Sequence, residues 1–134
     1  MSDLELMKLA VEARKASYSP YSHFKVGAAL LTKSGKTYLG CNVENAAYTP
    51  TNCAERTAVF KAVSEGEREF SAIAIVGGSG EEPAEFCAPC GICRQVLAEF
   101  CGQDFRVLLG TPNSFKAYTL SELLPFSFGK NDLT

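Results

Sequence analysis

The sequence predicts an α/β fold, a three-layer α-β-α sandwich built on a mixed five-stranded sheet. Short apolar runs such as Val26–Leu31 and Ala72–Val76 are typical of buried strands. Stretches with helical periodicity and capping signals separate these runs. The four residues at 111–114 are too few for a crossover helix, so the last two strands should be antiparallel and the sheet mixed.

The first half of the chain should contain one helix and one hairpin. Ser2-x-x-Glu5 is a capping-box pattern, and apolar residues follow it at helical spacing as far as Ala13. The expected elements are a helix that ends by residues 17–20, a strand at 26–31, a turn at 33–36 and a returning antiparallel strand at 37–43.

In the second half, two helices begin at cysteine motifs. Pro89 suits the start of the second of these helices, and Thr119-x-x-Glu122 is another capping box. The expected elements are a loop at 44–52, a helix at 54–65 closed by Gly66, a strand at 72–76, a loop at 77–88, a helix at 90–101 closed by Gly102, strands at 105–109 and 115–118, a last helix at 119–124 and a tail to Thr134.

Length and charge favour a single domain, residues 1–134, that acts on a small molecule. The chain has 134 residues, 46% of them hydrophobic and 21% charged, which suits one soluble domain with its own core. Its formal net charge is -2, and the basic residues are scattered singly. Because proteins that hold nucleic acid usually carry a basic stripe, we expect no nucleic-acid partner.

The cysteine content and the N-terminus indicate a cytoplasmic protein. Residues 1–5 are acidic and lack the basic region and apolar run of a signal peptide, and no apolar stretch approaches a membrane span. Six cysteines without a secretion signal favour a reducing compartment, in which thiols bind metals rather than pair. We therefore expect a cytoplasmic location and no membrane partner.

Two cysteine motifs predict a zinc site with an open position. Cys53-Ala54-Glu55 and Pro89-Cys90-Gly91-Ile92-Cys93 offer three sulfur ligands, a set that suits one tetrahedral Zn²⁺ per chain. Three protein ligands leave the fourth position for water, and Glu55 lies where a general acid/base for that water would be needed. The motifs therefore indicate hydrolysis by an activated water.

Other readings of the cysteines stay open. Cys87, Cys53, Cys90 and Cys93 could form a closed structural site, but Cys87 precedes Pro89 and should remain in the loop. An iron–sulfur cluster fits the spacing less well. His23, the only histidine, could be a fourth ligand but is more simply a surface residue, and Cys41 and Cys101 are most simply small apolar core residues.

Arg56 follows Glu55 directly, and the hypothesis for this residue is that it offsets part of the negative charge of such a site. Three thiolates on Zn²⁺ would carry a formal charge of about -1, which weakens the pull of the metal on its water. A guanidinium that donates hydrogen bonds to a thiolate sulfur would withdraw some of that charge. The alternative is a solvated arginine on the helix surface.

Beyond these motifs, nearly the whole chain resembles the small homotetrameric cytidine deaminases. The segments that carry the resemblance are residues 21–30 (YSHFKVGAAL), 40–48 (GCNVENAAY), 53–58 (CAERTA), 89–95 (PCGICRQ) and 122–125 (ELLP), with Phe128. Zinc-dependent deaminases share the two cysteine half-motifs and a glutamate that moves protons. One departure from the wider superfamily is Cys53, which stands where many members carry histidine.

The resemblance implies a role for each of several residues. Phe24 is expected to pack against the pyrimidine, Asn42 and Glu44 to hold the ribose hydroxyls, and Ala54 to contact the substrate. An amide and a carboxylate on alternate residues of a strand end can share a diol partner, although a capped turn is the structural alternative. The family's homotetramer implies that Tyr48 and Phe128 reach a neighbouring subunit's site.

The expected activity is hydrolytic, zinc-dependent deamination of cytidine and deoxycytidine to uridine and deoxyuridine with release of ammonia, a reaction of pyrimidine salvage. Glu55 would take a proton from the attacking water, pass it to the ring nitrogen and assist the departure of ammonia. Two alternatives remain: deamination of another small molecule that contains cytosine, such as an aminoacyl-nucleoside antibiotic, and a structural zinc module without turnover.

Overall fold

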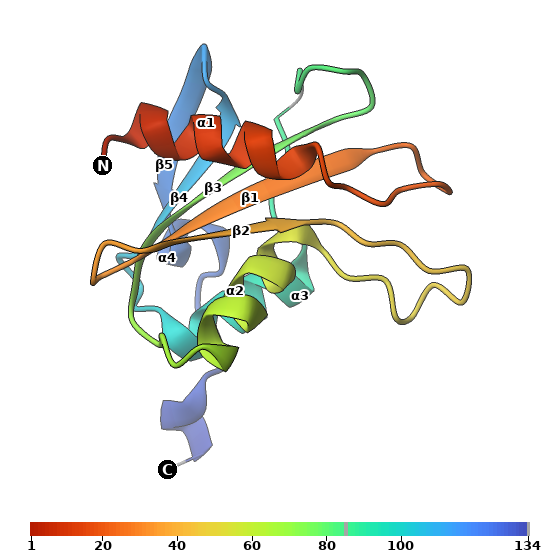
Figure 1. The fold of residues 1–134 in the computed structure, drawn as a ribbon. Coiled ribbons are helices and arrows are strands. Elements are labelled where there is room, and N and C mark those ends of the chain that lie inside the picture. Colours follow the sequence, from red (N-terminus) through yellow and green to blue (C-terminus); the bar gives the residue numbers. More distant parts are fainter. Residues whose placement is uncertain (85, 134) are drawn as a thin grey trace.

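A computed structural model describes residues 1–84 and 86–133; Glu85, within the predicted loop, and Thr134, the end of the predicted domain, lie outside the described residues. The sheet lies between α1 on one face and α2 and α3 on the other (Figure 1). In chain order the elements are α1 (Asp3–Arg14), β1 (Lys25–Thr32), β2 (Thr37–Cys41), α2 (Ala54–Ser64), β3 (Phe70–Gly78), α3 (Gly91–Phe100), β4 (Arg106–Thr111), β5 (Ser114–Thr119), α4 (Leu120–Leu123) and the 3-10 helix η1 (Lys130–Leu133).

The sheet has five strands in the order β2-β1-β3-β4-β5, and it is mixed, as predicted. β1 pairs antiparallel with β2 and with β3, β3 pairs parallel with β4, and β5 returns antiparallel beside β4. Two connections are crossovers between parallel strands: α2 joins β2 to β3, which lie on either side of β1, and α3 joins the neighbouring strands β3 and β4. The predicted three-layer arrangement is therefore confirmed.

Most strand ends differ from the prediction by one or two residues, and two of these differences have a clear physical cause. β2 ends at Cys41 rather than at Val43, because the chain leaves the sheet there and Val43 forms isolated bridges with Tyr18 and Asn52. β3 runs on to Gly78, so Gly77 and Gly78 belong to the strand and not to the loop after it. Both differences arise from pairing with residues that are distant in the sequence.

Two helix starts follow capping boxes predicted from the sequence, and a third lies one residue later than predicted. Ser2 and Thr119 each form the predicted capping box, with Glu5 and Glu122 as the reciprocal partners. The helix predicted from Cys90 begins at Gly91 instead, and Cys90 is its N-cap residue. No helix in the described part of the chain is long and apolar enough to cross a membrane.

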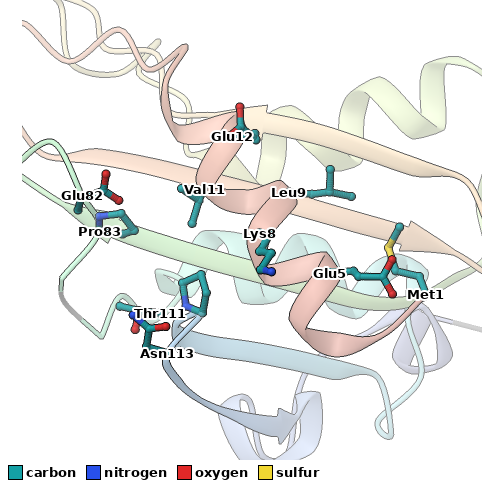
Figure 2. Close-up of a pocket in the computed structure, with 11 residues that line it drawn as sticks. Met1, Glu5, Lys8, Leu9, Val11, Glu12, Glu82, Pro83, Thr111 and Asn113 are labelled. Atoms are coloured by element: carbon teal, nitrogen blue, oxygen red, sulfur yellow. The ribbon is translucent and has the colours of Figure 1, made fainter.

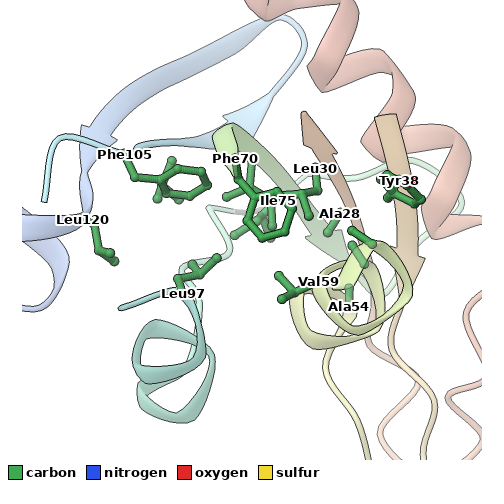
Figure 3. Close-up of a cluster of buried hydrophobic side chains, with 14 of the residues drawn as sticks. Ala28, Leu30, Tyr38, Ala54, Val59, Phe70, Ile75, Leu97, Phe105 and Leu120 are labelled. Atoms are coloured by element: carbon green, nitrogen blue, oxygen red, sulfur yellow. The ribbon is translucent and has the colours of Figure 1, made fainter. Parts of the chain in front are cut away.

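Both faces of the sheet are buried, which explains the uninterrupted apolar runs in the sequence. Figure 3 shows the larger cluster, in which side chains such as Leu30 and Ile75 meet Val59 of α2 and Leu97 of α3. Alternate strand residues, among them Ala29, point to the other face and pack beneath α1. Cys101 packs against the larger cluster, as predicted for a small apolar residue.

Two glycines bring helices into direct contact with strand backbones. A Cβ atom at Gly27 would lie 2.1 Å from the carbonyl oxygen of Ala10 in α1. A Cβ atom at Gly40 would lie 2.3 Å from the carbonyl oxygen of Ala54, the first residue of α2. Because no side chain fits between β2 and α2 here, the start of α2 is fixed against the sheet.

Candidate functional site

The starts of α2 and α3 bring three sulfur atoms together. Cys53 and Cys90 are the N-cap residues of the two helices, and neither side chain makes a capping hydrogen bond. Cys93 lies in the first turn of α3 and is fully buried. The Sγ atom of Cys90 is 3.7 Å from that of Cys53 and 3.5 Å from that of Cys93, and all three lie within 4.8 Å of one another.

This sulfur triangle fits a tetrahedral zinc ion. Zn–S bonds of about 2.3 Å place the sulfurs of a tetrahedral site about 3.8 Å apart, close to the separations found here. Among the described residues the group contains only these three cysteines; it does not include Cys87 or His23. The structure therefore brings together the three predicted ligands, and no fourth His, Cys, Asp or Glu ligand atom joins them among the described residues.

The surroundings favour a thiolate at Cys53. A hydrogen bond with Cys93 and another from Arg56 lower the pKa of the Cys53 thiol to about 5. The pKa of Cys93 is raised in turn, because its proton bonds to the Cys53 sulfur. The start of a helix carries a partial positive charge that also favours a thiolate.

Glu55 is buried beside the sulfurs. Its side chain is 4% exposed, and burial raises the pKa of this carboxyl to about 7, with a further contribution from the negative charge at Cys53. A carboxyl with a pKa near 7 can both accept and donate a proton at neutral pH. The structure thus places an acid/base group two residues along the same helix start from Cys53.

Arg56 points toward the sulfurs and not only into solvent. Its Nη2 atom donates a hydrogen bond to the Sγ atom of Cys53 at 3.4 Å, and the cysteine sulfurs raise the pKa of the guanidinium. Its Nε atom is buried without a hydrogen-bond partner among the described residues. The hypothesis from the sequence was that Arg56 donates a hydrogen bond to a thiolate sulfur, and the structure contains such a bond, to Cys53.

Asn42 follows β2 and joins three segments of the chain. Its Oδ1 atom accepts hydrogen bonds from the hydroxyl of Ser17 at 2.5 Å and from the backbone N–H of Val26 at 2.9 Å. Its Nδ2 atom donates to the carbonyl oxygen of Phe24 at 2.8 Å. A primary amide has two donor hydrogens, so one N–H of Asn42 remains for another acceptor.

Glu44 holds the loop that precedes Phe24. One carboxylate oxygen accepts the backbone N–H groups of Tyr21 at 3.0 Å and Ser22 at 3.1 Å, and the other accepts the hydroxyl of Ser22. These bonds, first of all the one from the Ser22 hydroxyl, lower the pKa of Glu44. The carboxylate is half-buried and charged, and one of its roughly four lone-pair positions is left.

Phe24 is half-buried, close to the strand that leads toward the cysteine loop. A Cβ atom at Gly77 would lie 3.1 Å from the ring of Phe24 and 2.8 Å from the sulfur of Cys87. Phe24 and Cys87 therefore flank the same glycine, and Cys87 also packs against the larger core cluster. The side chain of Ala54 is fully buried in that cluster, so any contact of Ala54 with a ligand would use its backbone.

Tyr48 and Phe128 lie on the surface of this chain. Tyr48 is 76% exposed on the loop before α2 and has a positive φ of 65°. With Glu44 it lines a hollow of about 290 Å³. Phe128 is 59% exposed, and its carbonyl oxygen accepts a hydrogen bond from Gln95 of α3 at 2.8 Å. Both aromatic side chains are therefore largely open to solvent in the single chain.

A larger hollow, of about 690 Å³, lies away from the sulfurs. Figure 2 shows it between α1 and the turn that joins β4 to β5, with Leu9 and Val11 on one side and Pro83 and Thr111 on the other. None of the predicted site residues is among the described residues that line it. Size alone therefore does not identify the site of chemistry in this molecule.

Several polar residues that hold the site together were not predicted from the sequence. Ser17 and Ser22 bind Asn42 and Glu44, and Arg94 and Gln95, which follow Cys93 in α3, bind the backbone carbonyls of Pro89 and Phe128. The signal for the serines would have been their place in the polar stretch between the first helix and the first strand. Their partners, however, lie more than twenty residues away in the sequence.

Comparisons with known proteins agree with this geometry. The family model described as "Cytidine and deoxycytidylate deaminase zinc-binding region" matches residues 1–109. The chain is 50% identical to the cytidine deaminase of Sporosarcina psychrophila over 98% of its length and 96% of the relative's, and 51% identical to that of Halalkalibacterium halodurans over 96% and 95%. A crystal structure of cytidine deaminase from Burkholderia pseudomallei superposes with a TM-score of 0.88 at 46% identity, covering 96% of this chain and all of that one.

Proposed function

The chain belongs to the family of zinc-binding cytidine and deoxycytidylate deaminases, and we propose that it converts cytidine and deoxycytidine to the corresponding uridines with release of ammonia. The protein is a hydrolase with a zinc site. The observation that carries the proposal is the triangle of three sulfurs with the buried carboxyl of Glu55 beside it. A closed structural site would need a fourth ligand and no acid.

Cys53, Cys90 and Cys93 would hold the zinc ion, one per chain. When bound, zinc would supply a nucleophile near neutral pH by lowering the pKa of a water molecule. Arg56 would offset part of the negative charge of the thiolates through its bond to Cys53. If Arg56→Ala changed neither zinc retention nor turnover, this role of Arg56 would be wrong.

Glu55 would carry the protons of the reaction. Its carboxylate would take one proton from the attacking water and deliver it to the ring nitrogen next to the carbon that bears the amino group. Glu55 would then take the proton of the hydroxyl newly added to that carbon and pass it to the amino group, which leaves as ammonia as the carbon–nitrogen bond breaks and the carbonyl of the product forms. A pKa of about 7 suits both directions of transfer, because neither the acid nor the base form is strongly favoured.

The loops before β1 and after β2 would bind the nucleoside. Phe24 would pack against the pyrimidine, with the backbone of Ala54 beside it. Asn42 retains one donor and Glu44 retains one acceptor position, which together match the donor and acceptor character of ribose hydroxyls. The charge of Glu44 would also disfavour a phosphate, so a nucleoside is preferred to a nucleotide.

We further propose a homotetramer in which Tyr48 and Phe128 complete a neighbouring subunit's site. Both aromatic side chains are largely exposed on the isolated chain, and exposed aromatic residues are typical interface anchors. The proposed place of the enzyme is the cytoplasm, in pyrimidine salvage, because zinc-binding cysteines must stay reduced. The domain that does this chemistry would span residues 1–134.

An absorbance assay on purified protein tests the function directly. The panel is cytidine, deoxycytidine, cytosine, cytidine monophosphate and adenosine, each followed by the spectral change on loss of the amino group. Turnover of the two nucleosides alone is the expected result. A zinc-loaded protein inert on the whole panel would contradict the proposal and favour a structural module, whereas turnover of another cytosine-containing molecule alone would redirect the substrate assignment.

A further inference from the structure

Arg94 joins two backbone segments that are distant in the sequence, one of which leads into the sulfur cluster. It follows Cys93 directly in α3, and its Nε atom donates a hydrogen bond to the carbonyl oxygen of Pro89 at 2.8 Å. Its Nη1 atom donates to the carbonyl oxygen of Leu123, the last residue of α4, at 2.6 Å. The half-buried guanidinium therefore bridges the approach to Cys90 and the end of the last α-helix.

The bond to Pro89 spans the segment that carries two of the three sulfurs, those of Cys90 and Cys93. Pro89 precedes Cys90, and the backbone N–H of Arg94 also donates to the carbonyl oxygen of Cys90 at 3.0 Å. Side chain and backbone of Arg94 thus fasten the turn that carries both Cys90 and Cys93. Because the Cys90 side chain makes no capping bond of its own, these two bonds help to fix where its sulfur points.

The bond to Leu123 anchors that turn to the C-terminal segment. Carbonyl groups in the last turn of a helix have no partner within the helix, so the guanidinium satisfies one that would otherwise need water. The neighbouring residue, Gln95, reaches the same segment at the carbonyl oxygen of Phe128. Arg94 and Gln95 therefore attach the end of α4 and the chain that follows it to α3, the helix that carries Cys93.

We propose that Arg94 is a positioning residue for zinc retention and that it couples the C-terminal segment to the metal site. It holds Cys90 in the geometry at which the three sulfurs meet, with the end of α4 as its anchor. The proposal rests on the proposed function, in that Cys90 and Cys93 are taken as zinc ligands. Its consequence is that loosening a segment without any ligand would speed the loss of zinc.

The test is the rate at which the zinc-loaded protein releases its metal to an excess of the colorimetric chelator 4-(2-pyridylazo)resorcinol. Arg94→Met keeps the length of the stem and removes both bonds, and we expect release about 10- to 100-fold faster, by analogy with the 10- to 100-fold loss of metal affinity when a residue that orients a metal ligand is removed. Arg94→Lys keeps the charge but can reach one carbonyl at a time, so its release rate should lie between those of the wild type and Arg94→Met.

Two controls separate this role from general stability. Arg106→Met removes another arginine with two side-chain hydrogen bonds, both to Asp3, and should leave the release rate unchanged. Gln95→Met loosens the tail without touching Pro89, and its release should be faster than wild type but slower than Arg94→Met. Thermal unfolding is followed for every variant, so that a loss of fold is not mistaken for loss of metal.

The outcomes distinguish this proposal from the proposed function. Folded Arg94→Met that releases zinc at the wild-type rate would overturn the positioning role while leaving the deaminase assignment intact. A wild-type protein that takes up no zinc would overturn the function itself. If Arg94→Met does not fold, Arg94→Lys decides the matter, and a wild-type release rate in that variant would contradict the proposal.

Discussion

The sulfur cluster and the loop of residues 44–51 are built in opposite ways. Cys53, Glu55 and Cys93 lie at the starts of two helices that pack on the main core, and Glu55 and Cys93 are buried. The loop of residues 44–51 projects beyond these helices (Figure 1) and is mostly exposed. The comparison teaches that the groups for bond breaking are fixed by the fold of one chain, whereas the groups for recognition depend on loop hydrogen bonds and on surfaces that this chain leaves open.

The largest effect should come from the ligands themselves. Cys90→Ala and Cys93→Ala each remove one sulfur of the triangle, so both variants should lose their zinc and their turnover. Cys87→Ala should keep one zinc per chain and most activity, because Cys87 packs against Gly77 and the core and lies outside the triangle. Metal analysis of the purified variants measures this.

This set of variants can also break the comparison. Zinc loss in Cys87→Ala, with a normal thermal unfolding curve, would mean that the loop before α3 contributes to metal binding. The claim that the metal ligands all lie at the starts of helices, and not in a loop, would then be wrong.

Glu55→Gln should have the next largest effect. The amide keeps the shape of the buried side chain but cannot move a proton, so turnover should fall roughly 100- to 10,000-fold while zinc stays bound. Single-turnover assays on protein with verified zinc content measure this. Substantial residual activity in the zinc-replete variant would move the proton transfers to another group.

Glu44→Gln tests the recognition side. Loss of a hydrogen bond from a charged group costs about 1.5–3 kcal/mol, so kcat/KM for cytidine should fall roughly 10- to 150-fold, mainly through KM. Glu12→Gln, an exposed glutamate on α1, is the matched control and should behave as wild type. A fall in kcat with an unchanged KM would place Glu44 with the chemistry and remove the distinction between the two regions.

Phe128→Ala should have the smallest of these effects and should sharpen the comparison most. If the ring closes a neighbouring subunit's pocket, its loss should raise KM several-fold and weaken the assembly, since a buried aromatic anchor can contribute a few kcal/mol. Light scattering and kinetics on the same samples measure both, with Leu133→Ala as a control in the same tail. A wild-type protein that is monomeric and fully active at micromolar concentration would refute the shared site.

Local signals predicted most of the fold and the centre of the site. Capping boxes at Ser2 and Thr119, the apolar runs, and cysteines at helix starts all act within a few residues, and the structure follows them. The end of β2 could not be predicted, because it depends on the bridge between Val43 and the distant Tyr18. Likewise, Arg94 binds Leu123 across 29 positions, a contact that exists only once α3 and α4 have packed together.

The glycine at position 40 has a consequence for anyone who wishes to make this enzyme more heat-resistant. Replacing glycine by alanine often raises stability by about 0.4–1 kcal/mol, because the unfolded chain loses freedom. At Gly40 the same change would press on the backbone of Ala54 and push the first turn of α2, with Cys53, away from its sulfur partners. At Gly91 an added Cβ would meet no atom within 4 Å apart from its own chain neighbours and the nearby backbone of α3, so engineering for heat resistance should begin there and leave position 40 untouched.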